Sequence, residues 1–98
     1  MPKKPDLFGD ERVCFVCGSP YVERHHVYGG VGRRQISERE GCCIYLCHEH
    51  HQGRYSAHQD KGFRDSLRAE CQRRWEQREG VTDHEAFIKV FGESFIRD

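Results

Sequence analysis

Two pairs of metal-binding side chains constrain this chain more than any other feature. Cys14 and Cys17 form the first pair, and Cys47 and His50 form the second. A gap of two residues lets a tight turn direct both side chains at one ion, and two such pairs complete the tetrahedral site that structural Zn²⁺ takes. The sequence therefore predicts a Cys3His zinc site formed by these four residues.

Spacing alone selects the fourth ligand. His50 keeps the two-residue gap, whereas His48 and His51 could exchange roles with it. A redox-active Cys14–Cys17 pair is a further alternative, but no thioredoxin-like strand and helix surround it. Unconnected buried thiols would not explain two pairs with matched gaps.

A zinc site also suits the thin apolar core of this chain. Of its 98 residues, 36% are hydrophobic and 33% are charged. A chain of this size buries a modest share of its surface, whereas zinc binding contributes on the order of 10 kcal/mol to folding. Six cysteines without an apparent export signal favour metal ligands over disulfides. We expect one zinc-stapled cytoplasmic domain without a membrane span.

The apolar pattern predicts an α+β fold. Residues 21–28 and 42–46 are typical of strands, and the polar residues 31–41 between them are typical of a loop. Residues 1–11 predict a flexible arm, residues 12–60 a metal-binding core, and residues 61–98 a helical extension of the same domain.

The predicted extension contains two helices. From about residue 59, apolar residues recur every four positions and form one stripe: Phe63, Leu67, Cys71 and Trp75. Gly80 is placed to end this helix. Thr82 and Glu85 match a capping box that would begin a last short helix. Cys42, Cys43 and Cys71 are expected to be small buried hydrophobic residues.

Four histidines suited to a second site remain once the zinc site is filled: His25, His26, His51 and His58. No packing argument requires a polar cluster inside the strand-like residues 23–27. A divalent ion held by two or three imidazoles keeps open positions for substrate, and a neutral imidazole can accept a proton near neutral pH. A solvated polar face is the alternative, and His58 could simply cap the following helix. His48 and His84 are expected to be surface residues.

Together these motifs resemble the HNH endonuclease family, whose fold is the ββα-metal finger. The resemblance covers about residues 12–60. It rests on the first Cys pair, on His25-His26 followed by a β-branched residue and a turn, and on Leu46-Cys47-x2-His50-His51. The loop pattern Gly29-Gly30…Arg33-Arg34…Ser37…Gly41-Cys42, with His51-x6-His58, further resembles small HNH proteins encoded in phage and prophage genomes.

The resemblance implies roles for individual residues. It implies that His25 and His51 bind a catalytic metal and that His26 is the general base. A further ligand of the family would fall on Tyr55, a poor ligand, so His58 is the better candidate. The family's middle Asn has no counterpart, because the chain contains no Asn. Ser37, whose hydroxyl can make similar local hydrogen bonds, is the expected replacement, with Gln35 as the second choice.

The expected function is metal-dependent hydrolysis of DNA phosphodiester bonds with little sequence specificity. Mg²⁺ or Mn²⁺ is expected at the catalytic site, which could also accept Ni²⁺ or Zn²⁺. Arginines near the proposed site are expected to contact DNA phosphates: Arg33, Arg34, Arg39 and Arg54.

Two alternatives to an autonomous nuclease remain open. One is a non-catalytic zinc-finger module that binds nucleic acid or a protein. The other is a subunit that acts only with a phage packaging or recombination enzyme. A homodimer would form if Phe87, Phe91 and Phe95 left an apolar patch at the surface.

Overall fold

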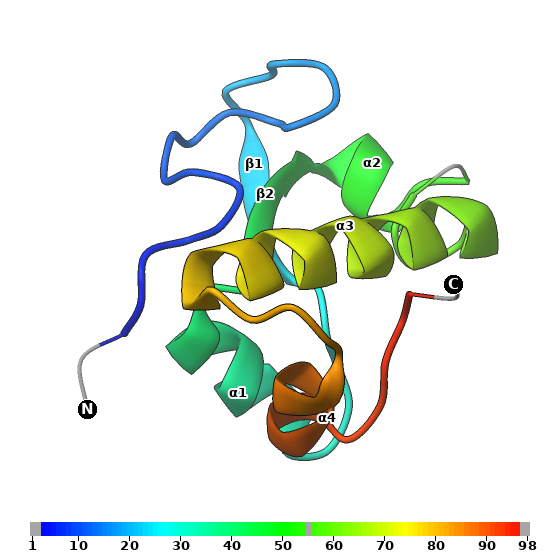
Figure 1. The fold of residues 1–98 in the computed structure, drawn as a ribbon. Helices are drawn as coiled ribbons and strands as arrows, with labels where there is room; N and C mark the ends of the chain where they lie inside the picture. Colours follow the sequence, from blue (N-terminus) through cyan, green and yellow to red (C-terminus); the bar gives the residue numbers. More distant parts are fainter. Residues whose placement is uncertain (1–2, 55, 97–98) are drawn as a thin grey trace.

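A two-stranded antiparallel sheet and four helices make up the part of the chain that the computed structural model describes, residues 3–54 and 56–96 (Figure 1). In chain order the elements are β1 (Val22–His26), α1 (Arg33–Glu40), β2 (Cys43–Cys47), α2 (His48–Gln52), α3 (Lys61–Glu79) and α4 (Glu85–Phe91). The predicted α+β class is confirmed. Figure 1 shows α2 at one end of the hairpin, α1 and α4 toward the other, and α3 running across the molecule.

The strand register separates the two histidines at the end of β1. His25 pairs with Ile44, and His26 pairs with Cys43. Because successive side chains of a strand point to opposite faces, these two histidines lie on opposite faces of the sheet. His25 is buried on the face with Ile44 and Leu46, and His26 is partly exposed on the other.

The predicted loop between the strands is wrong in part, because residues 33–40 form helix α1. Glycines in the left-handed region bracket this helix, Gly32 with φ 82° and Gly41 with φ 76°. A Cβ on Gly41 would also collide with the Pro5 carbonyl. The backbone N–H of Gly41 donates to the Ser37 carbonyl and closes the last turn.

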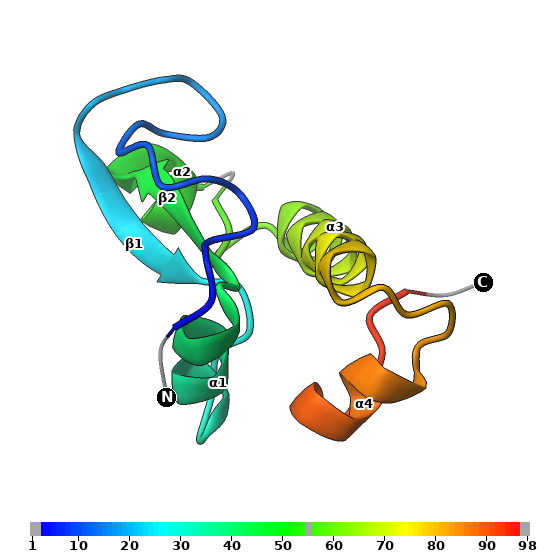
Figure 2. The same ribbon diagram turned by 60° about the vertical axis from the view of Figure 1, so that its left-hand side comes forward.

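Helix α3 carries the predicted apolar stripe, and Leu67, Cys71 and Trp75 are buried. Figure 2 shows α4 beside α3, on the side away from the hairpin. The rings of Phe87 and Phe91 are buried, and both pack against Tyr28. The apolar patch that would support a homodimer is therefore absent at these two rings.

The start of α4 differs from the predicted capping box. The helix begins at Glu85, and its N-cap is His84, which makes no side-chain capping bond. Asp83 instead accepts a hydrogen bond from the Glu85 backbone N–H at 3.0 Å. Gly80 does end α3, with φ 70°.

Residues 4–7 are held more firmly than the expected flexible arm. The backbone N–H of Lys4 donates to the Arg39 carbonyl, and that of Leu7 donates to the Gly41 carbonyl. Asp6 also accepts two hydrogen bonds from Arg24, at 3.0 and 3.2 Å. Among the described residues, no helix combines the length and hydrophobicity needed to cross a bilayer.

Glu40 generates a stability prediction, because it is a buried carboxylate that joins three parts of the fold. It accepts hydrogen bonds from Trp75 Nε1 at 3.0 Å and from Lys4 Nζ at 2.8 Å. We expect Glu40→Ala to lower the free energy of unfolding by about 2–4 kcal/mol, since the indole N–H loses its buried partner. Denaturant unfolding of zinc-loaded protein measures this change. Glu93→Ala, which removes an exposed ion pair with Arg33, should change it by less than about 0.5 kcal/mol.

Candidate metal centres

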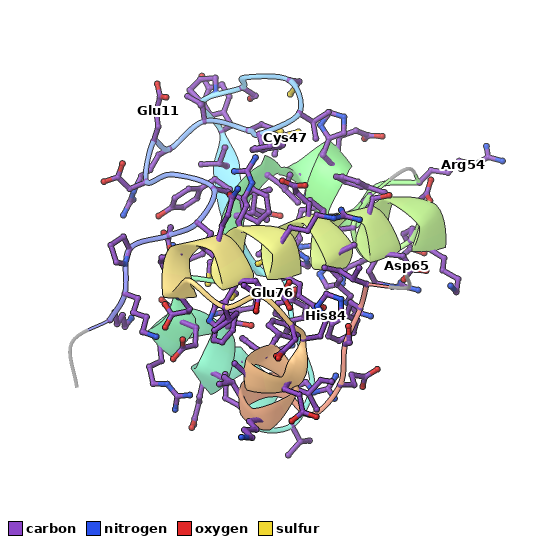
Figure 3. The ribbon with its side chains drawn as sticks, viewed as in Figure 1. Glu11, Cys47, Arg54, Asp65, Glu76 and His84 are labelled. Atoms are coloured by element: carbon purple, nitrogen blue, oxygen red, sulfur yellow. The ribbon has the colours of Figure 1, made fainter. Side chains whose placement is uncertain are left out.

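The two predicted zinc-binding pairs meet in space. Their four ligand atoms all lie within 4.8 Å of one another. Cys14 and Cys17 come from the turn before β1, whereas Cys47 ends β2 and His50 lies in α2. Figure 3 labels Cys47 near the point where β2 meets α2. The backbone N–H of Phe15 donates to the Tyr45 carbonyl at 3.0 Å, which holds the turn against β2.

The distances fit a tetrahedral zinc ion. Two thiolates bound to one Zn²⁺ lie about 3.8 Å apart, and a thiolate and an imidazole nitrogen lie about 3.5 Å apart. Cys17 Sγ is 3.8 Å from Cys47 Sγ. His50 Nδ1 is 3.2 Å from Cys47 Sγ and 3.5 Å from Cys14 Sγ. The cluster could thus hold zinc, with Nδ1 as the imidazole ligand, and the choice of His50 over His48 and His51 agrees with this geometry.

Backbone groups also prepare one thiol for metal binding. Burial raises the pKa of Cys14, but backbone hydrogen bonds at Cys47, Cys17 and Val16 lower it to about 6. The lowered pKa favours the thiolate of Cys14, the form that binds metal.

Three of the remaining histidines also converge, as the sequence predicts. The ligand nitrogens of His25, His51 and His58 lie within 4.8 Å of one another. His51 Nε2 and His58 Nε2 are 3.0 Å apart. Two nitrogens bound to one divalent ion at about 2.1 Å lie roughly 3.0–3.4 Å apart, so this triad fits a second metal ion.

Three elements bring the triad together. His25 comes from β1, His51 from α2, and His58 from the segment between α2 and α3. The backbone N–H of His58 donates to the His51 carbonyl at 3.3 Å, so this segment folds back on α2. Gly53 permits the fold-back, because a Cβ there would collide with the Glu49 carbonyl.

Glu23 orients one member of the triad. Its Oε1 lies 2.7 Å from His51 Nδ1. Hydrogen bonds with His51 and His48 lower the pKa of Glu23, so its carboxylate accepts and His51 Nδ1 donates. The lone pair of His51 is then on Nε2, which faces His58. A carboxylate behind a histidine ligand is the usual way in which proteins fix the tautomer of a metal-binding imidazole.

Burial prepares His25 as a neutral ligand. Desolvation is the main cause, with electrostatic interactions with His51 and His58 next, and together they lower the pKa of His25 to about 3. A buried neutral imidazole binds a cation without first losing a proton.

His26 belongs to different surroundings. Its Nε2 lies 2.7 Å from Glu38 Oε2. The His26 ring nitrogen, the Glu38 carboxylate and Cys43 Sγ lie within 4.8 Å of one another, apart from the triad. This position on the opposite face of β1 separates His26 from the triad.

Ser37 is buried and does not contact His26 through its hydroxyl. The hydroxyl donates to the Tyr28 carbonyl at 2.8 Å and accepts from the Tyr28 backbone N–H at 3.2 Å. It therefore fixes the chain just after β1, and its expected catalytic role in place of Asn stays a prediction. Gln35 is exposed. Tyr55, the alternative ligand position, lies outside the described residues.

The four predicted phosphate-binding arginines differ in their surroundings. Arg33 forms an ion pair with Glu93, and Arg39 forms one with Glu40. Arg34 is exposed, has no ion-pair partner among residues 3–54 and 56–96, and helps to lower the pKa of His58, for which burial is the main cause. Arg54 points outward at the edge of the molecule in Figure 3.

Sequence reasoning missed three residues around these clusters. Glu23 could have been noticed, because it lies two positions before His25 and hence on the same face of β1. Glu38 could not be placed while residues 31–41 were expected to be a loop. Arg68, whose charge contributes to the lowered pKa of His25, comes from α3.

Comparisons with known proteins add no relative: no family model matches the chain, and neither a curated protein nor a solved structure matches it.

The zinc assignment predicts different behaviour for neighbouring histidines. We expect His50→Ala to lose tightly bound zinc and to unfold at a lower temperature, because one of four ligands is removed. His48→Ala should keep about one equivalent at this site, since the His48 side chain is 74% exposed and lies outside the cluster. Elemental analysis after dialysis measures the metal, and thermal unfolding measures the stability. Equal zinc content in the two variants would contradict the assignment of His50.

Proposed function

We propose that this protein is a metal-dependent DNA endonuclease of the HNH type. The observation that carries the proposal is the triad of His25, His51 and His58, which lies directly beside the Cys3His cluster because His51 follows His50. The order β1, β2 and α2, with the triad drawn from β1 and from α2 and its following segment, supports an assignment to the ββα-metal finger.

The two clusters suit different tasks. The Cys3His set supplies four protein ligands and leaves no position for substrate, as is typical of a structural site. The triad supplies three imidazoles, so an ion there retains open positions. Such an ion, Mg²⁺ or Mn²⁺ by our proposal, would supply charge stabilisation for the scissile phosphate and for the leaving 3′ oxygen.

The hydrolysis that we propose needs one proton acceptor. A water oxygen forms a bond to phosphorus while the bond from phosphorus to the 3′ oxygen breaks. His26 takes the proton from the attacking water, and the leaving oxygen gains a proton from solvent. The products are a 5′ phosphate and a 3′ hydroxyl.

The charges around the triad favour a phosphate ligand. Arg34 and Arg64 both contribute to the lowered pKa of His58, after burial and His51, and Arg68 acts likewise on His25. The side chain of Arg64 also donates to the His58 carbonyl at 3.3 Å. These cations support binding to the sugar–phosphate backbone, which carries no sequence information.

A plasmid-nicking assay tests the catalytic proposal. We expect wild-type protein to cut with Mn²⁺, and His26→Ala to cut about 100-fold more slowly or worse while still binding DNA, because the base is removed and the phosphate contacts remain. His48→Ala serves as the matched histidine control and should cut at the wild-type rate. The assay is repeated with Mg²⁺, Ni²⁺ and Zn²⁺ to identify the active ion.

The same assay separates the proposal from a binding module. Binding of DNA by wild-type protein without cutting, in the presence of each ion, would favour a non-catalytic zinc finger, the function to which the missing Asn points. Cutting that survives in both His26→Ala and His51→Ala would place the activity elsewhere.

Salt dependence tests the arginines. We expect Arg34→Ala to weaken DNA binding and to reduce the slope of log K against log salt by about 0.9 for each phosphate that the side chain neutralises in wild type. Arg39→Ala should change the slope less, since its guanidinium is paired with Glu40. Binding of wild-type protein that does not depend on salt would contradict phosphate contacts altogether.

A further inference from the structure

The Glu38 carboxylate of helix α1 forms a hydrogen bond with His26, the proposed general base. Glu38 Oε2 lies 2.7 Å from His26 Nε2, and both side chains are partly exposed. No residue of the described chain is found to hydrogen-bond His26 Nδ1. One ring nitrogen is therefore committed to the protein, and the other is available to a water molecule.

The charge on Glu38 decides which nitrogen carries the proton. Hydrogen bonds from Arg24 are the main cause that keeps the pKa of Glu38 well below its ordinary value. Burial, the next largest cause, opposes this shift, and hydrogen bonds with Lys3 and His26 lower the pKa further. Arg24 donates through Nε at 3.3 Å and through Nη2 at 3.0 Å. An ionised carboxylate only accepts hydrogen bonds, so the contact requires a proton on His26 Nε2.

We infer that Glu38 is the positioning residue for the base, fixing His26 as the Nε2–H tautomer with the Nδ1 lone pair directed to the attacking water. This inference rests on the proposed nuclease function and assigns to Glu38 the orienting task for which the chain has no Asn. A carboxylate behind a catalytic imidazole both selects the tautomer and stabilises the cation that forms when the base accepts a proton.

A third metal site would be the other interpretation of this group, because Cys43 also lies within 4.8 Å. The cations already bound to Glu38, from Arg24 and Lys3, argue against it. Burial is the main cause that raises the pKa of Cys43 to about 12, so its thiol stays protonated and donates to Glu38 at 3.5 Å. A protonated thiol beside a neutralised carboxylate is a poor ligand pair.

The test combines a spectroscopic and a kinetic measurement on metal-loaded protein. At about pH 8, where an ordinary imidazole is neutral, nitrogen-15 NMR should show His26 as the Nε2–H tautomer in wild type and as a mixture in Glu38→Ala. We expect kcat of the same variant to be about 10- to 100-fold lower and KM to be nearly unchanged. Without Glu38, His26 no longer presents its lone pair to the attacking water, whereas the contacts that bind DNA remain. Glu38→Gln, whose amide oxygen can accept the same proton, should retain the tautomer and recover part of kcat.

Two controls isolate the hydrogen bond to His26. Asp6→Asn removes the other acidic partner of Arg24 and leaves Glu38 in place. This variant should keep the wild-type tautomer and kcat, which shows that the bond from Glu38 to His26, rather than the ion pair of Arg24 with Asp6, is responsible. Adding Glu38→Ala to His26→Ala should lower the rate no further, since the two residues act as one unit. Amide spectra and thermal unfolding establish that each variant is folded.

The outcomes distinguish the inference from the function on which it rests. A His26 tautomer or a kcat that is unchanged in folded Glu38→Ala overturns the inference and leaves the nuclease proposal in place. Absence of cutting by wild-type protein with every ion overturns the nuclease proposal, and the catalytic role of Glu38 with it, whatever the spectrum shows.

Discussion

The meeting of residues 14–17 with residues 47–50 is the constraint on which the rest of this structure depends. Helix α2 begins immediately after Cys47, so an ion bound to Cys47 and His50 sets the direction in which α2 leaves the sheet. His51 is the next residue, and its ring is thereby brought toward His25 on β1, at a centroid separation of 5.1 Å. With a core this thin, metal binding at the Cys3His cluster, worth on the order of 10 kcal/mol, would stabilise both the fold and the geometry of the second cluster.

The alternation of side chains along β1 places two adjacent histidines in different surroundings. His25 faces the triad, and His26 faces helix α1. A carboxylate stands behind a histidine on each face: Glu23 behind His51 and Glu38 behind His26, both at 2.7 Å. In both pairs the carboxylate accepts from one ring nitrogen and leaves the other nitrogen with its lone pair. Under the proposed function, the same physical arrangement would prepare one imidazole to bind a cation and another to accept a proton.

The sequence predicted the ligand sets better than their surroundings. Metal ligands are few in kind and regular in spacing, so Cys14, Cys17, Cys47 and His50 could be grouped without knowledge of the fold. Helix α1 escaped prediction because it has only one apolar residue, Ile36, and hence no hydrophobic periodicity. The buried side chains of Ser37 and Glu40, with Gly41 as C-cap, tie it to the fold through contacts distant in sequence. The predicted capping box of Thr82 and Glu85 is wrong because α4 begins only at Glu85, so Thr82 lies too far before the helix to cap it.

The net charge of the chain does not describe the electrostatic field around the triad of His25, His51 and His58. The chain has no formal net charge, which by itself indicates no particular partner. Within α1, Arg39 pairs with Glu40 and Arg33 pairs with Glu93. Arg34 has no ion-pair partner among the described residues, because Glu38 pairs with Arg24. Arg34, Arg64 and Arg68 act on the triad. Because salt screens an exposed charge beyond a short distance, the electrostatic field at His58 depends on these nearby cations rather than on the balanced total.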